Sequence, residues 1–128
     1  MRAVGILKDG DSVFLIRRIK GGKEYYVFPG GEVKKKETPK EAVKREIKEE
    51  LGIAPKKCRL AFEYENKGNK EYYFLMSEYE GMPRLGGSER IRMNEKNQYY
   101  VEKFSKNALQ YLDNLHPQEI IDKVIKVL

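Results

Sequence analysis

The first part of the chain alternates short apolar runs with turn residues, a pattern typical of β-strands. Residues 3–8 and 12–19 are rich in Val, Ile, Leu and Phe, and Asp9-Gly10 lies between them. Because this dipeptide tolerates the positive φ angles of a two-residue turn, the pattern predicts a β-hairpin. A third strand is predicted over 24–28 and ends at Pro29-Gly30-Gly31. Proline cannot donate to a strand ladder and glycine permits unusual backbone geometry, so a shaped loop is expected there.

Residues 39–51 have the spacing of an amphipathic helix. The apolar positions of its buried stripe recur every four residues: Val43, Ile47 and Leu51. Thr38 is a natural N-cap, and Glu41 completes a Thr-x-x-Glu capping box, in which each residue bonds the backbone N–H of the other. Pro39 suits the first helical position, and Gly52 suits the left-handed position that ends many helices. The sequence therefore predicts a helix over 39–51.

The remainder of the chain is predicted to form further strands and two short helices. In chain order the pattern indicates a strand at 57–65, a turn at 66–70, a strand at 72–79, an irregular loop at 81–97, a strand at 98–104, and helices at 106–112 and 118–128. Two sets of apolar side chains are expected to face the core: Cys58, Leu60, Phe62 and Tyr64 from the first strand, and Ile120, Ile121, Val124 and Ile125 from the last helix. This order predicts an α/β fold with a mixed sheet covered by helices on both faces.

The composition favours a single folded domain over residues 1–128. Forty per cent of the residues are hydrophobic although 36% are charged, and the length suits one compact domain. The apolar stretches run to only four or five residues, whereas a bilayer span needs about 20. Charged residues at 8 and 9 precede any signal-peptide core. Cys58 is the one cysteine, so no internal disulfide can form and the residue is expected to be a small core side chain. We therefore expect a cytoplasmic protein without a membrane partner.

The charge balance alone does not identify a partner. Lysine and arginine total 26 against 20 acidic residues, a net charge of +6, which is compatible with nucleic-acid binding. The excess is spread thinly along the chain, however, and the short basic run at 34–36 lies between Glu32 and Glu37. A mildly positive surface attracts any polyphosphate, including a free nucleotide. We expect a small nucleotide rather than a nucleic acid, and the sequence leaves the oligomeric state open, a homodimer included.

The predicted helix also carries a cluster of carboxylates. Glu46, Glu49 and Glu50 stand at i, i+3 and i+4, so their side chains project within one turn of each other. We place this face roughly opposite the apolar stripe. Such a cluster is in most helices a solvated face, because glutamate is a good helix former. Like charges at this spacing nevertheless invite a counter-ion, and carboxylate oxygens suit a hard divalent cation such as Mg²⁺.

The residues around this cluster form a longer motif. Residues 31–53 read GEVKKKETPKEAVKREIKEELGI, that is, Gly, five residues, Glu37, seven residues, and then Arg45-Glu46-Ile47-x-Glu49-Glu50-x-Gly52-Ile53. This segment resembles the Nudix box, G-x5-E-x7-R-E-U-x-E-E-x-G-U with U apolar, at every specified position. The preceding Phe28-Pro29-Gly30-Gly31 also resembles the usual approach to that box. The resemblance implies an α/β/α sandwich with a mixed β-sheet between helices.

The resemblance to the Nudix family also implies a chemistry. Nudix enzymes hydrolyse a nucleoside diphosphate linked to another group, by attack of a metal-activated water on phosphorus. The residues implied in this chain are Gly30, Glu37, Arg45, Glu46, Glu49 and Glu50. The last three would bind Mg²⁺ or Mn²⁺ beside the Pro-Gly-Gly bend, with the Gly30 carbonyl as a backbone ligand, and Glu46 or Glu49 would remove the proton of the water. Arg45 would orient the glutamates, and Glu37 would support the loop or the metal site.

The substrate is set by residues outside the box and stays open. A nucleoside or deoxynucleoside triphosphate pyrophosphohydrolase is the first reading, and a dinucleoside polyphosphate or a nucleotide sugar are the others. Three aromatic side chains are candidates for stacking on a nucleobase: Tyr25, Tyr72 and Tyr73. Glutamates beyond the box that could join the metal site are Glu78, Glu80 and Glu89. His116, the one histidine, precedes Pro117 at a predicted helix start and is expected to be a cap or surface residue.

A different class of function is also compatible with the sequence. The same fold could serve as a non-catalytic module that binds a nucleotide or RNA through its basic surface. The intact glutamates argue against that alternative, because a pure binder has no need for crowded carboxylates beside bound phosphates.

Overall fold

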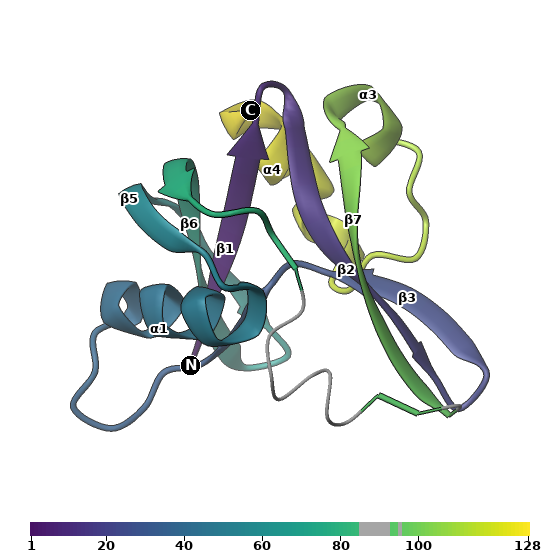
Figure 1. Cartoon of the computed structure of the whole chain (residues 1–128), viewed down its shortest axis with the longest axis horizontal. Coiled ribbons are helices and arrows are strands. Elements are labelled where there is room, and N and C mark those ends of the chain that lie inside the picture. The colour runs from purple at the N-terminus through teal and green to yellow at the C-terminus, as the bar shows by residue number, and fades with distance from the viewer. Residues whose placement is uncertain (85–92, 95) are drawn as a thin grey trace.

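Most of the predicted elements are present in a computed structural model, which describes residues 1–84, 93, 94 and 96–128 (Figure 1). The elements in chain order are β1 (Arg2–Asp9), β2 (Ser12–Lys20), β3 (Lys23–Val27), β4 (Gly30–Glu32), α1 (Pro39–Leu51), β5 (Ala54–Asn66), β6 (Asn69–Glu80), β7 (Asn97–Ser105), α3 (Lys106–Leu109), the 3-10 helix η1 (Gln118–Ile120) and α4 (Ile121–Val127). None of the helices in these residues is long and apolar enough to cross a bilayer.

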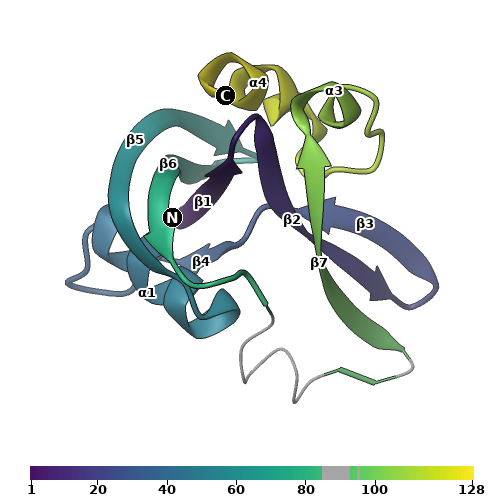
Figure 2. The same cartoon turned by 45° about the horizontal axis from the view of Figure 1, so that its top comes forward.

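Strand β1 is the centre of a mixed sheet. It pairs in parallel with β6 along Arg2 to Leu7, and β5 continues the sheet antiparallel to β6. On its other edge β1 pairs with β4 near its start and with β2 near its end. Strand β2 then pairs with β3 and with β7. Figure 2 shows the result, in which β2, β3 and β7 form a wing that turns away from the β1, β6 and β5 strands.

Helices cover both faces of this sheet (Figure 1). On one face, the apolar stripe of α1 packs with a set of buried strand residues: Ala3, Leu7, Phe74 and Met76. On the other face, α3, η1 and α4 pack through Leu109, Ile120, Ile121 and Val124 against Val4, Ile6 and Leu75. Neighbouring residues of β1 therefore serve opposite cores, as the alternation of side chains along a strand requires. The predicted α/β/α arrangement is confirmed, and each fully buried Leu or Ile contributes about 2 kcal/mol to it.

The helix ends follow the predicted local chemistry. Thr38 Oγ1 accepts the Glu41 N–H at 3.1 Å, and Glu41 Oε1 accepts the Thr38 N–H at 2.9 Å. Gly52 takes the left-handed conformation with φ of 69°. The helix bounds of 39–51 are confirmed, because capping residues act on their own backbone and need no distant partner.

The segment after β3 differs from the prediction. Gly30-Gly31 was expected in a shaped loop, but it lies in the short strand β4, where Gly30 pairs with Val4 and Gly31 with Ala3. The Pro29 carbonyl accepts the Gly5 N–H at 2.8 Å. Proline ends β3 as expected, and the chain then returns to pair with the free edge of β1. That partner is distant in the sequence, so local turn chemistry did not reveal it.

The hairpin of β5 and β6 is longer than predicted, and its turn is confined to residues 67 and 68. Its register shifts between Leu60 and Phe62, and a bulge reverses the side-chain alternation. The expectation that Leu60 faces the core is therefore wrong, since Leu60 is 44% exposed. The C-terminal helices are shorter than predicted, but Ile120, Ile121 and Val124 are buried as expected. Much of the predicted loop 81–97 lies outside the described residues.

Candidate active site

The glycine strand β4 lies against helix α1, and Glu46 occupies the contact. A methyl group on Gly31 would lie 2.6 Å from both carboxylate oxygens of Glu46, closer than real contacts allow. Glycine therefore leaves the space that the Glu46 carboxylate uses. At Gly30 a methyl would meet backbone instead, the Ala3 carbonyl oxygen and the Val4 Cα at 2.8 Å. The two glycines therefore allow different close contacts. Gly30 lets the backbone of β1 approach, and Gly31 lets the Glu46 side chain approach.

Arg45 connects the acidic residues to one another. Its Nε and Nη2 donate to the two carboxylate oxygens of Glu37 at 2.7 and 3.0 Å. Its Nη1 donates to Glu46 at 2.8 Å and to Glu49 at 3.4 Å, and Nη2 also reaches the Glu32 carbonyl at 3.1 Å. The Arg45 side chain is only 21% exposed. Bidentate pairing of this kind fixes orientation as well as charge. This is the geometry expected of a residue that orients the glutamates.

Glu37 fastens the loop before α1 to Arg45. Besides Arg45, Glu37 Oε1 accepts the Lys34 backbone N–H at 2.9 Å. The Arg45 hydrogen bonds, followed by that backbone bond, lower the pKa of Glu37 to about 2. Both bonds favour the ionised form. The predicted support role of Glu37 thus has a concrete form, in which one carboxylate joins the loop backbone to the side chain that holds Glu46.

Acid is expected to weaken the metal-free fold partly through Glu37. Its pKa is about 2 in the folded protein against an ordinary 4.5. The unfolded chain therefore takes up the proton first, so the stabilisation by Glu37 is complete above about pH 5 and is lost as the pH falls toward 2. Thermal unfolding in EDTA from pH 7 to 2.5 should show wild type more stable than Glu37→Gln at pH 7, with the difference shrinking in acid. A difference that is constant over this range would contradict the assignment.

The three clustered glutamates do not share one environment. The Glu49 side chain is 57% exposed and that of Glu46 is 21% exposed, while Glu50 is a buried residue at 8% exposure. The expectation that this face lies opposite the apolar stripe is wrong. At about 100° per residue, Glu50 lies only about 20° from Val43 around the helix. A carboxylate inside an apolar stripe is a stronger functional signal than a carboxylate cluster, and the sequence contained it.

The donors fit a hard divalent cation by their chemistry. In the described residues no three His, Cys, Asp or Glu side chains lie close enough together to form a metal-binding group, so the expected three-carboxylate cradle is not preformed. Arg45 contacts one oxygen each of Glu46 and Glu49, and a carboxylate has a second oxygen for a cation. Mg²⁺ usually takes one or two carboxylates and fills its remaining positions with water and substrate phosphates. The residues present therefore suffice without a complete cage.

A cavity of about 630 Å³ lies beside η1, on the face of the sheet opposite α1. It is lined in part by Val4, Phe28 and Tyr73, and its volume suits a small-molecule ligand. Arg18 also lines it, and the buried Arg18 Nε has no hydrogen-bond partner in the described residues. The guanidinium is held from the other side, because Arg18 Nη2 donates to Tyr99 Oη at 2.9 Å. Arg18 was not singled out from the sequence, where its only signal is charge at the end of an apolar strand.

The three tyrosines predicted to stack on a nucleobase lie in different parts of the structure. Tyr73 lines the cavity. Tyr25 instead stacks on His116 with ring centroids 4.6 Å apart, and these two rings line a neighbouring depression. Tyr72 packs against the core on the α1 side of the sheet, under Lys70. His116 is a surface residue, as expected, and it also lines the rim of the cavity.

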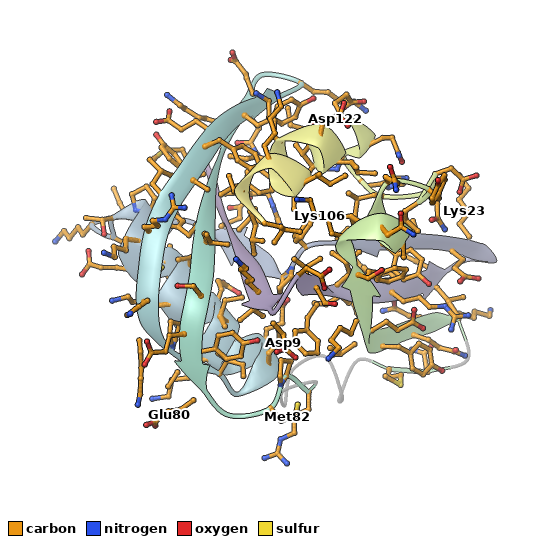
Figure 3. All side chains as sticks on the ribbon, turned by 90° about the horizontal axis from the view of Figure 1, so that it is seen from above. Asp9, Lys23, Glu80, Met82, Lys106 and Asp122 are labelled. Carbon is orange, nitrogen blue, oxygen red and sulfur yellow. The ribbon has the colours of Figure 1, made fainter. Side chains whose placement is uncertain are left out.

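The glutamates considered beyond the box are held elsewhere or lie outside the described residues. Glu78 and Glu80 are exposed and form ion pairs with Lys57 at 3.4 Å and Lys56 at 2.9 Å. Figure 3 shows Glu80 at the periphery of the molecule. Glu89 lies outside the described residues. Cys58 is half-buried in β5, and burial raises the pKa of its thiol, consistent with the expected packing role rather than a nucleophile.

The chain is similar to known proteins both in its sequence and in its fold. The family model described as NUDIX domain matches residues 1–115. Two proteins named 8-oxo-dGTP diphosphatase are similar over 88 residues, or 63% of this chain. The protein from Haemophilus influenzae is 35% identical over 65% of its own length, and the one from Escherichia coli is 33% identical over 68%. The aligned region thus spans just under two thirds of the length of the Haemophilus influenzae protein and just over two thirds of the Escherichia coli protein.

Further similarity comes from shorter and from structural matches. An RNA pyrophosphohydrolase from Hahella chejuensis is 51% identical over 43 residues, which cover 34% of this chain and 26% of that protein. A solved MutT structure, from work on the Aliivibrio salmonicida and Vibrio cholerae proteins, has a TM-score of 0.78 at 20% identity over 99% of this chain and 97% of that one. At this identity the structural match shows the fold.

Proposed function

Because the chain belongs to the Nudix domain family, we propose that it is a metal-dependent pyrophosphohydrolase that cleaves the diphosphate linkage of a nucleotide. The observation that supports this most is the pair of α1 carboxylates that Arg45 contacts, Glu46 and Glu49, with Glu46 packed closely on Gly31. A helix face on which like charges are held together in this way serves chemistry better than stability.

In this proposal the carboxylates of α1 and the cavity have different tasks. Glu46, Glu49 and Glu50 would hold Mg²⁺ or Mn²⁺, with the Gly30 carbonyl oxygen as a further metal ligand. Such an ion, when bound, neutralises the diphosphate and lowers the pKa of a bound water. Arg45 keeps Glu46 in place, and Glu37 keeps Arg45 in place. Glu46 or Glu49 takes the proton of the attacking water, because each has a carboxylate oxygen that Arg45 does not contact.

The cavity holds the nucleoside end of the substrate. Its lining combines apolar side chains, which suit a base, with the charged side chains of Arg2, Arg18 and Glu71, which suit the polar groups of a nucleotide. The relatives named 8-oxo-dGTP diphosphatase point to a triphosphate. We therefore take a nucleoside or deoxynucleoside triphosphate as the substrate, ahead of a dinucleoside polyphosphate or a nucleotide sugar.

A nucleotide panel tests this function directly. Incubated with Mg²⁺ and a panel of triphosphates, dinucleoside polyphosphates and nucleotide sugars, the protein should release pyrophosphate from at least one triphosphate. EDTA should abolish that release and added Mg²⁺ should restore it. Titration with Mn²⁺, followed by electron paramagnetic resonance, should show binding that Glu46→Gln weakens. RNA binding with a steep salt dependence and no turnover of any nucleotide would support the non-catalytic module instead.

A further inference from the structure

A second buried carboxylate lies in the cavity, away from the motif. Among the described residues, only Glu50 and Glu71 are buried charged side chains, and Glu71 is 4% exposed. Glu71 stands near the start of β6 as the register partner of Arg2 on β1, and both residues line the cavity. Nothing in the diphosphate chemistry proposed above uses Glu71. A buried carboxylate that faces a ligand cavity requires an explanation, because its desolvation is costly.

The neighbours of Glu71 hold it in place without neutralising it. Tyr73 Oη donates to Glu71 Oε1 at 2.8 Å, and Asn66 Nδ2 donates to Oε2 at 3.2 Å. In the described part of the chain Glu71 forms no ion pair within 4.0 Å. Burial, and then the adjacent Glu71 charge, raise the pKa of Tyr73 above its ordinary range, so the phenol stays a donor. A carboxylate has about four acceptor positions, and two of them therefore remain for a ligand.

Apolar side chains and one cation surround Glu71 in the cavity. Phe28 and Tyr73 meet edge to face with ring centroids 6.4 Å apart, and Val4, Val27 and Leu115 supply further apolar surface. Arg2 places a cation on the same wall as Glu71, because the two residues are paired on adjacent strands. Strands lie about 4.8 Å apart. A donor and a double acceptor are thus presented side by side at the edge of the cavity.

We propose that Glu71 selects nucleotides whose base presents two adjacent N–H donors, which among the common bases is guanine. The N1–H and 2-amino groups of guanine match the two free acceptor positions of the carboxylate, and O6 lies on the side where Arg2 donates. Adenine places the acceptor N1 where guanine has N1–H, so a buried carboxylate opposes it. 8-Oxoguanine keeps the same edge as guanine, so Glu71 does not separate the two. This inference rests on the proposed hydrolysis, because it describes how the same site recognises its substrate.

Wild-type protein tests the match before any substitution. The kcat/KM for dGTP should exceed that for dATP at least about 50-fold, since a site built to bond a polar edge rejects a base that lacks it. dITP keeps N1–H and lacks the 2-amino group, and it should fall between them, about 10-fold below dGTP. Preference for dATP, or equal use of all purine triphosphates, would overturn the assignment.

The Glu71→Gln variant separates base reading from structural support. Glutamine still accepts from Tyr73 but presents an N–H₂ group to the base, so kcat/KM for dGTP should fall about 50-fold while that for dATP changes less than about 3-fold. Glu65→Gln, an exposed glutamate on the same hairpin, is the matched control and should change neither. Equal losses for both bases would indicate that Glu71 only supports the fold.

Binding of the product keeps this inference distinct from the proposed hydrolysis. Calorimetric titration of metal-free protein with dGMP and dAMP needs no turnover. Tighter binding of dGMP, lost in Glu71→Gln, would support the base-reading role even if no triphosphate were hydrolysed. Hydrolysis of triphosphates without any dGMP preference would instead retain the enzyme and remove the role of Glu71.

Discussion

Replacement of Glu50 by glutamine is expected to lower kcat at least about 100-fold while the fold survives. Glu50 is the buried member of the carboxylate cluster, and its place within the apolar stripe of α1 gives it no packing advantage over a leucine. Because Glu50 belongs to the motif at residues 31–53, we expect its carboxylate to act in the reaction. Glutamine has nearly the same shape, so the change removes the negative charge and leaves the packing of the helix.

The measurement pairs activity with unfolding. Pyrophosphate release from the best triphosphate should fall by this factor, and the melting temperature of metal-free protein should stay within about 3 °C. Glu65→Gln controls for loss of one negative charge elsewhere and should retain full activity. An active Glu50→Gln protein would place the ion-binding carboxylates at Glu46 and Glu49 alone.

The Gly31→Ala change is expected to lower activity about 30-fold with little loss of stability. A methyl group there would overlap the Glu46 carboxylate, and this carboxylate is the end of a flexible side chain. The side chain can swing away at low cost to the fold, but it then leaves the position that Arg45 holds. In Gly31→Ala, activity should therefore fall while the melting temperature at pH 7 stays close to that of the wild type.

Gly30→Ala is the matched comparison one residue earlier. Its methyl would meet the backbone of β1 at Ala3 and Val4, and backbone in a paired strand cannot move aside. This variant should unfold at a clearly lower temperature or fail to accumulate as folded protein. If Gly31→Ala were as unstable as Gly30→Ala, the contact with Glu46 would be a packing requirement of the fold rather than a feature of the site.

What the sequence predicted well was decided by neighbouring residues. The bounds of α1 follow from Thr38, Glu41 and Gly52, each of which acts on backbone within a few positions. The motif at 31–53 is contiguous, so its acidic residues and Arg45 could be assigned together. The burial of Glu50 was also within reach, because helix geometry alone places it beside Val43.

The remainder required long-range pairing. The cavity combines Arg2 of β1, Arg18 of β2 and Glu71 of β6, and these residues meet only because β1 lies beside β6 and β2 turns back from it. No periodicity marks such a meeting. The exposure of Leu60 likewise depends on a bulge whose position is set by the partner strand. Polar residues in otherwise apolar strands were the one local signal for the cavity.

Strand β1 supplies neighbouring residues to both functional regions, one on each face of the sheet. Ala3 pairs with Gly31 beneath the Glu46 carboxylate, while Val4 and Arg2 line the cavity. Successive residues of one strand cannot separate, so the backbone itself holds these two regions at a fixed spacing.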